Sequence, residues 1–164
     1  MTADDAAVLN RILRTTRIAH LGTLRDVGGM HPCPAPLVSM TLFMAESDFT
    51  AFHVHVSRLA WHTQDMIKDA RVSLSVAEDD DRRDDPFTLA RVSVHGEAAL
   101  LANSGAEFER LREAWLARFP QQAVNFTLAD FNFWRIAPRD ARFVAGFGRI
   151  HNLSAADLRA VAIG

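Results

Sequence analysis

The segment Thr88–Leu101 is long enough for a complete barrel strand. Gly96 lies inside it, where a glycine permits the bulge or bend that lets a sheet close on itself. Closure is a common way for such a sheet to protect the unpaired backbone groups at its edges. This segment therefore predicts an antiparallel sheet that curls toward a barrel.

Shorter segments with strand-like patterns predict the remaining strands of this sheet, for a total of six or seven. They cover residues 17–25, the stretch from Leu37, and residues 49–56, 71–76, 131–136 and 142–145. Asp26–Gly29 has the composition of a turn, and Pro138–Asp140 is expected to join the last two strands as a hairpin. The three prolines of His31–Pro36 remove backbone donors, so we expect no strand before Leu37.

Helical spacing of apolar residues predicts helices at both ends of the chain and in two of its connections. The expected helices cover 3–15, 58–68 and 104–118, with a short last helix after Ser154. Thr2, Ser57, Asn103 and Ser154 precede them and are residue types that cap helix N-termini. Helices at the periphery of several antiparallel strands indicate an α+β protein with an antiparallel barrel.

The chain shows no internal repeat and no long linker, so we expect one domain over 1–164. Its parts are an N-terminal helix (1–16), a barrel with helical connections (17–146) and a C-terminal segment (147–164). The net charge of −2 argues against nucleic acid as a partner. No apolar run approaches the roughly 20 residues of a membrane helix. With no secretion signal at the N-terminus and a single cysteine, Cys33, a cytoplasmic location is expected.

Three stretches of the sequence resemble a known family. They are Ser57–Thr63 followed by Asp69–Leu74, then Arg91–Ala98, and finally Gly146–Arg149 with Leu153–Leu158. In this order and spacing they are similar to the haem-utilisation branch of the pyridoxamine 5'-phosphate oxidase-like family. The resemblance implies an FMN-binding split β-barrel with peripheral helices, and a homodimer with the cofactor site at its interface.

The resemblance places the FMN phosphate at the start of the helix after Ser57. Backbone N–H groups and the positive end of a helix dipole favour an anion at such a position. Ser57, His62 and Thr63 have side chains that can donate to phosphate oxygens, and Arg58 can pair with them, with Leu59 between. The alternative is that Ser57 only caps the helix, Arg58 is solvated and His62 packs against Leu59.

Further cofactor contacts are implied for Ser39 and Met40 beside the flavin ring, and for Arg91 reaching the flavin of a partner subunit. The prolines leave the strand register across Pro32–Met40 open, and a slip of one residue would exchange the two faces of that strand. Arg91 is equally well explained as a surface arginine of the barrel. These residues complete the set of candidate cofactor contacts.

One departure from the family limits the expected chemistry. Relatives that oxidise pyridoxamine phosphate usually carry an arginine and a lysine where this chain has His62 and Thr63, so that substrate is not expected. No acid, base or nucleophile can be assigned, which suits an oxidoreductase whose cofactor does the redox chemistry. An FMN-dependent oxidoreductase of unknown substrate is the first hypothesis, and a flavin-binding module without turnover is a simpler one.

A haem-binding or haem-degrading protein is the alternative hypothesis from a different class. Haem iron is commonly held by a histidine, and His151, which follows the Gly146–Arg149 motif, is the candidate ligand. A surface histidine before a terminal helix is the simpler explanation of His151. His53 and His55 share one side of a strand, but no third ligand completes a metal site around them, so no structural metal is predicted.

Overall fold

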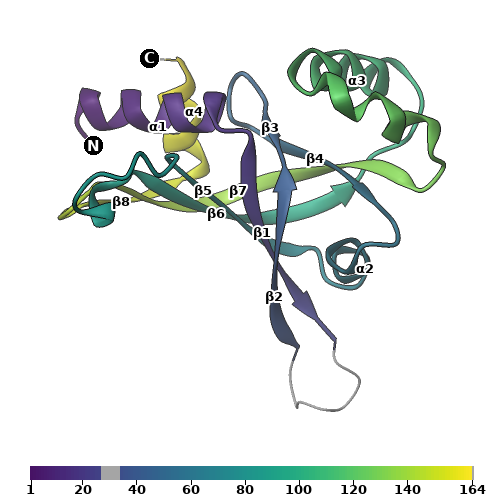
Figure 1. Ribbon diagram of the computed structural model, residues 1–164, viewed down its shortest axis with the longest axis horizontal. Helices are drawn as coiled ribbons and strands as arrows, with labels where there is room; N and C mark the ends of the chain where they lie inside the picture. The colour runs from purple at the N-terminus through teal and green to yellow at the C-terminus, as the bar shows by residue number, and fades with distance from the viewer. Residues whose placement is uncertain (27–33, 164) are drawn as a thin grey trace.

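The computed structural model describes residues 1–26 and 34–163 and contains one strongly curled antiparallel sheet (Figure 1). The strand order is β2-β1-β5-β6-β7-β4-β3, and β8 pairs with β7. The strands are β1 Ile18–Arg25, β2 Ala35–Leu42, β3 Met44–Ala45, β4 Phe52–Ser57, β5 Arg71–Ala77, β6 Arg91–Leu100, β7 Phe131–Gly146 and β8 Arg149–Ser154. The predicted α+β class with an antiparallel split barrel is confirmed.

The helices lie at the periphery of this sheet (Figure 1). They are α1 Ala3–Thr15, α2 Trp61–Lys68, α3 Ala106–Arg118 and α4 Ala155–Ile163, with short 3-10 helices η1 Pro86–Thr88 and η2 Pro120–Thr127. The helices α1 and α4 pack together, whereas α3 packs with η2 at the other end of the molecule. Two predicted caps are confirmed, because Thr2 Oγ1 accepts from the Asp5 amide and Ser154 exchanges hydrogen bonds with Asp157.

Two groups of buried apolar side chains hold these layers together. The larger group lies on the inner face of the sheet under α1 and α4, and the smaller one lies between β7 and α3. The smaller group consists of Leu111, Trp115, Phe119 and Phe133. Each large side chain buried in this way contributes about 1.5–3 kcal/mol. Burial in both groups therefore fixes the curvature of the sheet on which any site must be built.

The predicted irregularity at Gly96 is confirmed. His95 pairs with Asp140 and Gly96 pairs with Pro138, so Arg139 is an extra residue on β7. A Cβ atom at position 96 would lie 2.4 Å from the Ala137 carbonyl oxygen, which no side chain tolerates. A glycine is therefore required where β6 and β7 bend around each other.

The predicted hairpin at Pro138–Asp140 is wrong, because β7 runs without interruption from Phe131 to Gly146. Pro138 lies at the bulge, where the ladder is already disturbed and a missing N–H donor is tolerated. The strand predicted from Leu37 begins earlier, at Ala35. Pro36 is accepted there because β2 is the last strand of the sheet path and one of its sides has no strand partner.

The starts of two helices also differ from the prediction. Helix α2 begins at Trp61 rather than Arg58, with Ala60 at its N-cap, and helix α3 begins at Ala106 after Gly105. Asn103 does not cap α3, since its side-chain amide donates to the Phe131 carbonyl. Predicted strand boundaries at Phe49 and Thr88 shift to Phe52 and Arg91. Cys33, Pro32 and most of the turn predicted after Asp26 lie outside the described residues.

Candidate functional site

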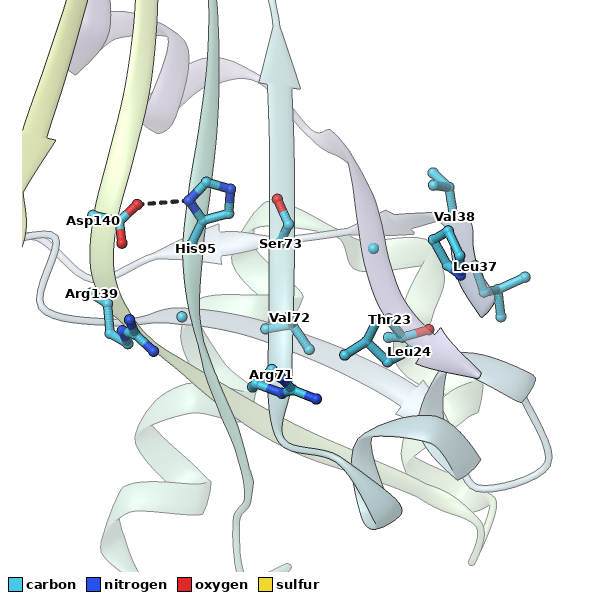
Figure 2. A pocket seen from close by; sticks show the side chains of 13 residues that line it. Thr23, Leu24, Leu37, Val38, Arg71, Val72, Ser73, His95, Arg139 and Asp140 are labelled. Carbon is cyan, nitrogen blue, oxygen red and sulfur yellow. Dashed lines mark hydrogen bonds and ion pairs between the residues drawn. The ribbon is translucent and has the colours of Figure 1, made fainter. Parts of the chain in front are cut away.

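A shallow groove of about 450 Å³ lies on the face of the sheet opposite the main core. Alternation along β5 and β6 sends Val72 and Val94 into the core and leaves Ser73 and His95 on the open face. The groove is lined by Gly22, Thr23, Leu24, Pro36, Leu37, Val38, Arg71, Val72, Ser73, His95, Gly96, Arg139 and Asp140. Five neighbouring strands therefore contribute to one site, which Figure 2 shows from close by.

A histidine–aspartate pair stands at one side of the groove. His95 Nδ1 lies 2.6 Å from Asp140 Oδ1, and the two residues face each other across β6 and β7 (Figure 2). Both side chains are about half exposed, at 55% and 51%. When Nδ1 donates to the carboxylate, the lone pair of the neutral ring is on Nε2, to which no described residue is hydrogen-bonded. His95 is therefore oriented as a ligand or a proton acceptor.

The opposite side of the groove is apolar. Leu24, Pro36 and Val38 from β1 and β2 line it, and Val38 is 67% exposed. Gly22 lies between them, and a Cβ atom there would meet Ser73 only at 3.5 Å, so the groove is open above this position. A planar apolar molecule can lie against such a surface while one end meets the polar pair.

Two arginines lie at the lower rim of the groove in Figure 2. Arg71 pairs with Asp69, and its hydrogen bonds lower the pKa of that carboxyl to about 2. Arg139 is the exposed extra residue of the bulge. The groove thus joins an apolar wall, an oriented imidazole and cationic groups suited to carboxylates.

The residues predicted to hold an FMN phosphate lie between the end of β4 and the first turn of α2, and their side chains differ in exposure and bonding. Ser57 Oγ donates to the Asp130 carboxylate and accepts from the Leu59 amide at 3.0 Å. Leu59 and Arg58 are exposed. Thr63 is fully buried, and its hydroxyl meets no partner within the described part of the chain. A carboxylate therefore stands beside Ser57 where an anion was expected.

His62, like Thr63, has a buried polar atom without a partner. Burial lowers the pKa of His62, with Asp65 acting in the opposite direction, and its buried Nε2 is unpartnered among residues 1–26 and 34–163. The helix is held to β1 by Asp65, which accepts from Thr23 at 2.9 Å and from Arg25 at 3.3 Å. The Ser57 hydroxyl is bonded to Asp130 and the donors of His62 and Thr63 are buried, so these three side chains do not offer an FMN phosphate an accessible set of donors.

The other predicted cofactor contacts lie apart from α2 and from each other. Ser39 and Met40 are neighbours on β2 and point to opposite faces, with Met40 exposed opposite His20. Arg91 lies at the end of the β5–β6 ladder that is remote from α2, and it donates to the carbonyls of Phe87 and Leu89. Ser39 and Met40 were predicted beside the flavin ring and Arg91 at the flavin of a partner subunit, and these contacts stay predictions.

His151 is engaged in a second histidine–aspartate pair. Its Nε2 lies 2.8 Å from Asp5 Oδ2, and Arg149 donates to the other oxygen of the same carboxylate at 2.5 Å. Asp5 is almost completely buried. Burial alone would raise the pKa of Asp5, but the hydrogen bond from His151 and the charge of Arg149 lower it below its usual value. This pair fastens α1 to β8.

The two histidines weighed as metal ligands lie in different surroundings. Burial lowers the pKa of His53, which contacts Glu46 Oε1 at 2.9 Å, and His55 is surrounded by aromatic rings. Within residues 1–26 and 34–163, no group of three or more potential ligands could hold a metal ion. The described helices include none that is long and apolar enough to span a membrane.

The family model for the CREG β-barrel matches residues 1–158. The chain belongs to the CREG β-barrel family. The resemblance to the haem-utilisation branch of the oxidase-like split barrels is confirmed by two curated relatives of this CREG-family chain. The chloroplastic heme oxygenase HOZ of Arabidopsis thaliana is 34% identical over 111 residues, which are 68% of this chain and 32% of that protein.

The second relative is the heme oxygenase HutZ of Vibrio cholerae, 26% identical over 131 residues, which are 75% of this chain and 69% of HutZ. A solved heme-binding protein from Mycobacterium smegmatis superposes with a TM-score of 0.82 at 24% identity, covering 98% of this chain and 62% of that one. This CREG-family chain thus matches about a third of the length of the Arabidopsis relative. All three relatives are named for haem.

Sequence reasoning on this CREG-family chain did not single out the His95–Asp140 pair. His95 lies inside the Arg91–Ala98 string that supported the resemblance, and its alternation with Val94 could have placed it on the open face. Asp140 was assigned to a turn, so its pairing with β6 was hidden. A continuous β7 is what brings the two side chains together.

Proposed function

We propose that this CREG-family protein binds haem in the groove on the open face of its sheet, with His95 as the ligand of the iron. The observation that carries the proposal is the His95–Asp140 pair beside an apolar wall. A carboxylate bonded to one ring nitrogen fixes the tautomer and makes the other nitrogen a better metal ligand. Haem is commonly ligated by a single histidine in this way.

The remaining groove residues fit the other parts of haem. Leu24, Pro36 and Val38 offer an apolar surface to the porphyrin, while Arg71 and Arg139 offer cations to its carboxylates. A groove of about 450 Å³ on the open sheet covers part of such a molecule. Bound haem supplies an iron centre that can bind oxygen. The protein's own residues position it, exclude water from one face and neutralise its acids.

The relatives' names add support from outside the structure. Two are called heme oxygenases and one a heme-binding protein. We therefore infer that haem handling, and haem oxygenation in particular, is the activity to test in this chain. An FMN-dependent oxidoreductase and a flavin module without turnover stay as predictions that lack a fitting phosphate site.

We also propose that the protein forms a homodimer that covers the groove. Val38 and Met40 are exposed apolar side chains on β2, next to the groove, and Ile18 on β1 lies on the same face. Burying this surface against a second copy would complete the enclosure of a bound haem. Light scattering should give twice the protomer mass of 18.2 kDa, and a monomer would contradict the dimer.

The function is tested by titrating the purified protein separately with hemin and with FMN. The wild type should give a stoichiometric Soret band and little quenching of flavin fluorescence. Gly22→Leu fills the groove without a backbone clash and should weaken haem binding at least tenfold, whereas Ala77→Leu at the far end of β5 should not. No haem complex, or an FMN complex instead, would overturn the proposal.

A further inference from the structure

A second pocket of about 360 Å³ lies between the end of β4, helix α3 and the segment around η2. His55, Asn103, Phe108, Arg112, Phe126 and Phe131 are among the residues that line it. None of these residues lines the groove beside His95. The volume lies in the range of sites for small molecules.

Several described residues have a buried polar atom without a partner, and His55 is the one of them that lines this pocket. It is 7% exposed, and its buried Nδ1 is unpartnered in the part of the chain that the structure describes. Its ring is stacked on Phe126 at 4.3 Å and contacts Phe133 at 4.6 Å. A buried polar atom without a partner costs about 1–3 kcal/mol. A cost of this size at a lining residue points to a ligand.

A second unpartnered group lies in the same aromatic cluster. Trp115 Nε1 is buried with no partner among the described residues, and the Trp115 ring meets the His55 ring edge-on at 6.0 Å. Burial lowers the pKa of His55 to about 4, so its imidazole is neutral near pH 7. The floor of the pocket is thus rich in aromatic surface and contains a neutral imidazole.

The mouth of the pocket is cationic. Arg112 is half exposed and lies over the Phe126 ring at 5.6 Å, and among the described residues its ion-pair partner is Glu109, at a long distance of 3.4 Å. Asn103 and Thr127 supply further polar groups at the edge. An arginine in this position can pair with a carboxylate while the aromatic walls hold an apolar body.

We propose that this pocket binds a small aromatic carboxylate, with its ring between Phe108, Phe126 and Phe131, its carboxylate on Arg112, and His55 as an inner hydrogen-bonding partner. The site is separate from the haem groove, so the two ligands do not compete. The proposal does not depend on haem binding.

The test uses benzoate as the probe and saturation-transfer NMR and calorimetry as the readouts. The wild type should bind benzoate with a dissociation constant on the order of a millimolar or lower. Arg112→Gln should weaken benzoate at least tenfold and leave the uncharged probe benzyl alcohol unchanged. Arg159→Gln, an exposed arginine on α4, is the matched control and should bind benzoate normally.

A second variant separates the pocket from general surface charge. His55→Phe keeps an aromatic ring in the cluster and should also weaken benzoate, with both probes affected. Gly22→Leu should bind benzoate as the wild type does, because its change lies in the other site. Absence of benzoate binding in the wild type, or binding that Arg112→Gln leaves unchanged, would overturn the proposal. Failure of His55→Phe to fold would still leave the Arg112 comparison decisive.

Discussion

The chain contains two histidine–aspartate pairs with similar bonding and opposite surroundings. In one, His95 and Asp140 face each other on the open side of the sheet, each about half exposed. In the other, His151 binds Asp5, a carboxylate that is 1% exposed and that also accepts from Arg149. The first pair leaves a ring nitrogen beside a groove, and the second joins two elements of the core.

The difference shows that residue type and hydrogen bonding alone do not identify a functional histidine. A charged group buried with its partners contributes to stability through bonds that are costly to break. An exposed ion pair contributes little, with typical values of 0–1 kcal/mol. The His95–Asp140 pair therefore has little structural role, and its place beside the groove supports the proposal that it serves a ligand.

The largest effect is expected from exchanging each histidine in turn for alanine. His95→Ala should weaken haem binding about 100-fold, which corresponds to about 2.7 kcal/mol, because the iron loses its ligand. His151→Ala should bind haem within about twofold of the wild type. Soret titrations of both variants measure this difference directly.

The reverse result would contradict the assignment. If His151→Ala lost the Soret complex and His95→Ala kept it, the ligand would be His151, and the groove would have another role. Circular dichroism on both variants controls for loss of the fold.

The second-largest effect is expected on protein stability when the carboxylates of Asp5 and Asp140 are replaced in turn. Asp5→Asn should lower the free energy of unfolding by about 2 kcal/mol, since it weakens charged hydrogen bonds to His151 and Arg149 in a buried place. Asp140→Asn is the matched variant on the open face and should change stability by less than about 0.5 kcal/mol. Urea unfolding measures the free energy of unfolding of both variants. Equal losses would contradict the expected difference between the buried and the exposed carboxylate.

A smaller effect is expected on haem binding from the exposed carboxylate. Asp140→Asn keeps the shape of the side chain but weakens its hold on the His95 ring. Substituting a group that orients a metal ligand typically costs 10–100-fold in affinity, and we expect the lower end, about tenfold. Asp5→Asn, measured at a temperature where it is folded, should bind haem normally. An Asp140→Asn variant with wild-type affinity would show that Asp140 does not position the ligand.

Much of the fold follows from the sequence because its signals are local. Alternation predicted the strand around Leu74, and Gly96 marked the bulge, since these features need only the pleat and a missing Cβ. Pro138 was misleading because its place in a strand depends on a non-local contact. A proline normally ends a strand, and only pairing with Gly96 across the sheet makes room for it.

The site was harder to predict because its side chains come together through contacts between distant segments of the chain. The charged and hydroxyl side chains that begin at Ser57 form a compact motif in sequence. The Ser57 hydroxyl, however, donates to the carboxylate of Asp130, which comes from a distant segment of the chain. His95 and Asp140 are likewise far apart in the chain and become neighbours only through the register of β6 and β7. Non-local pairing of this kind leaves no signal in a short stretch of sequence.

The smallest expected effect is a difference in how acid pH changes the stability that each of the two pairs contributes. The pKa of Asp5 is lowered in the folded state, because the bonds from His151 and Arg149 outweigh burial, so its contribution is present above the unfolded value near 3.8. That contribution is lost as the pH falls below 3.8 and the carboxylate takes up a proton in the folded protein. The stability gap between wild type and Asp5→Asn should therefore narrow below that pH. The gap between wild type and Asp140→Asn should stay near zero from neutral to acid pH. Urea unfolding at a series of pH values measures both gaps, and a gap for Asp5→Asn that is constant down to pH 2 would mean that its charge does not stabilise the contact between α1 and β8.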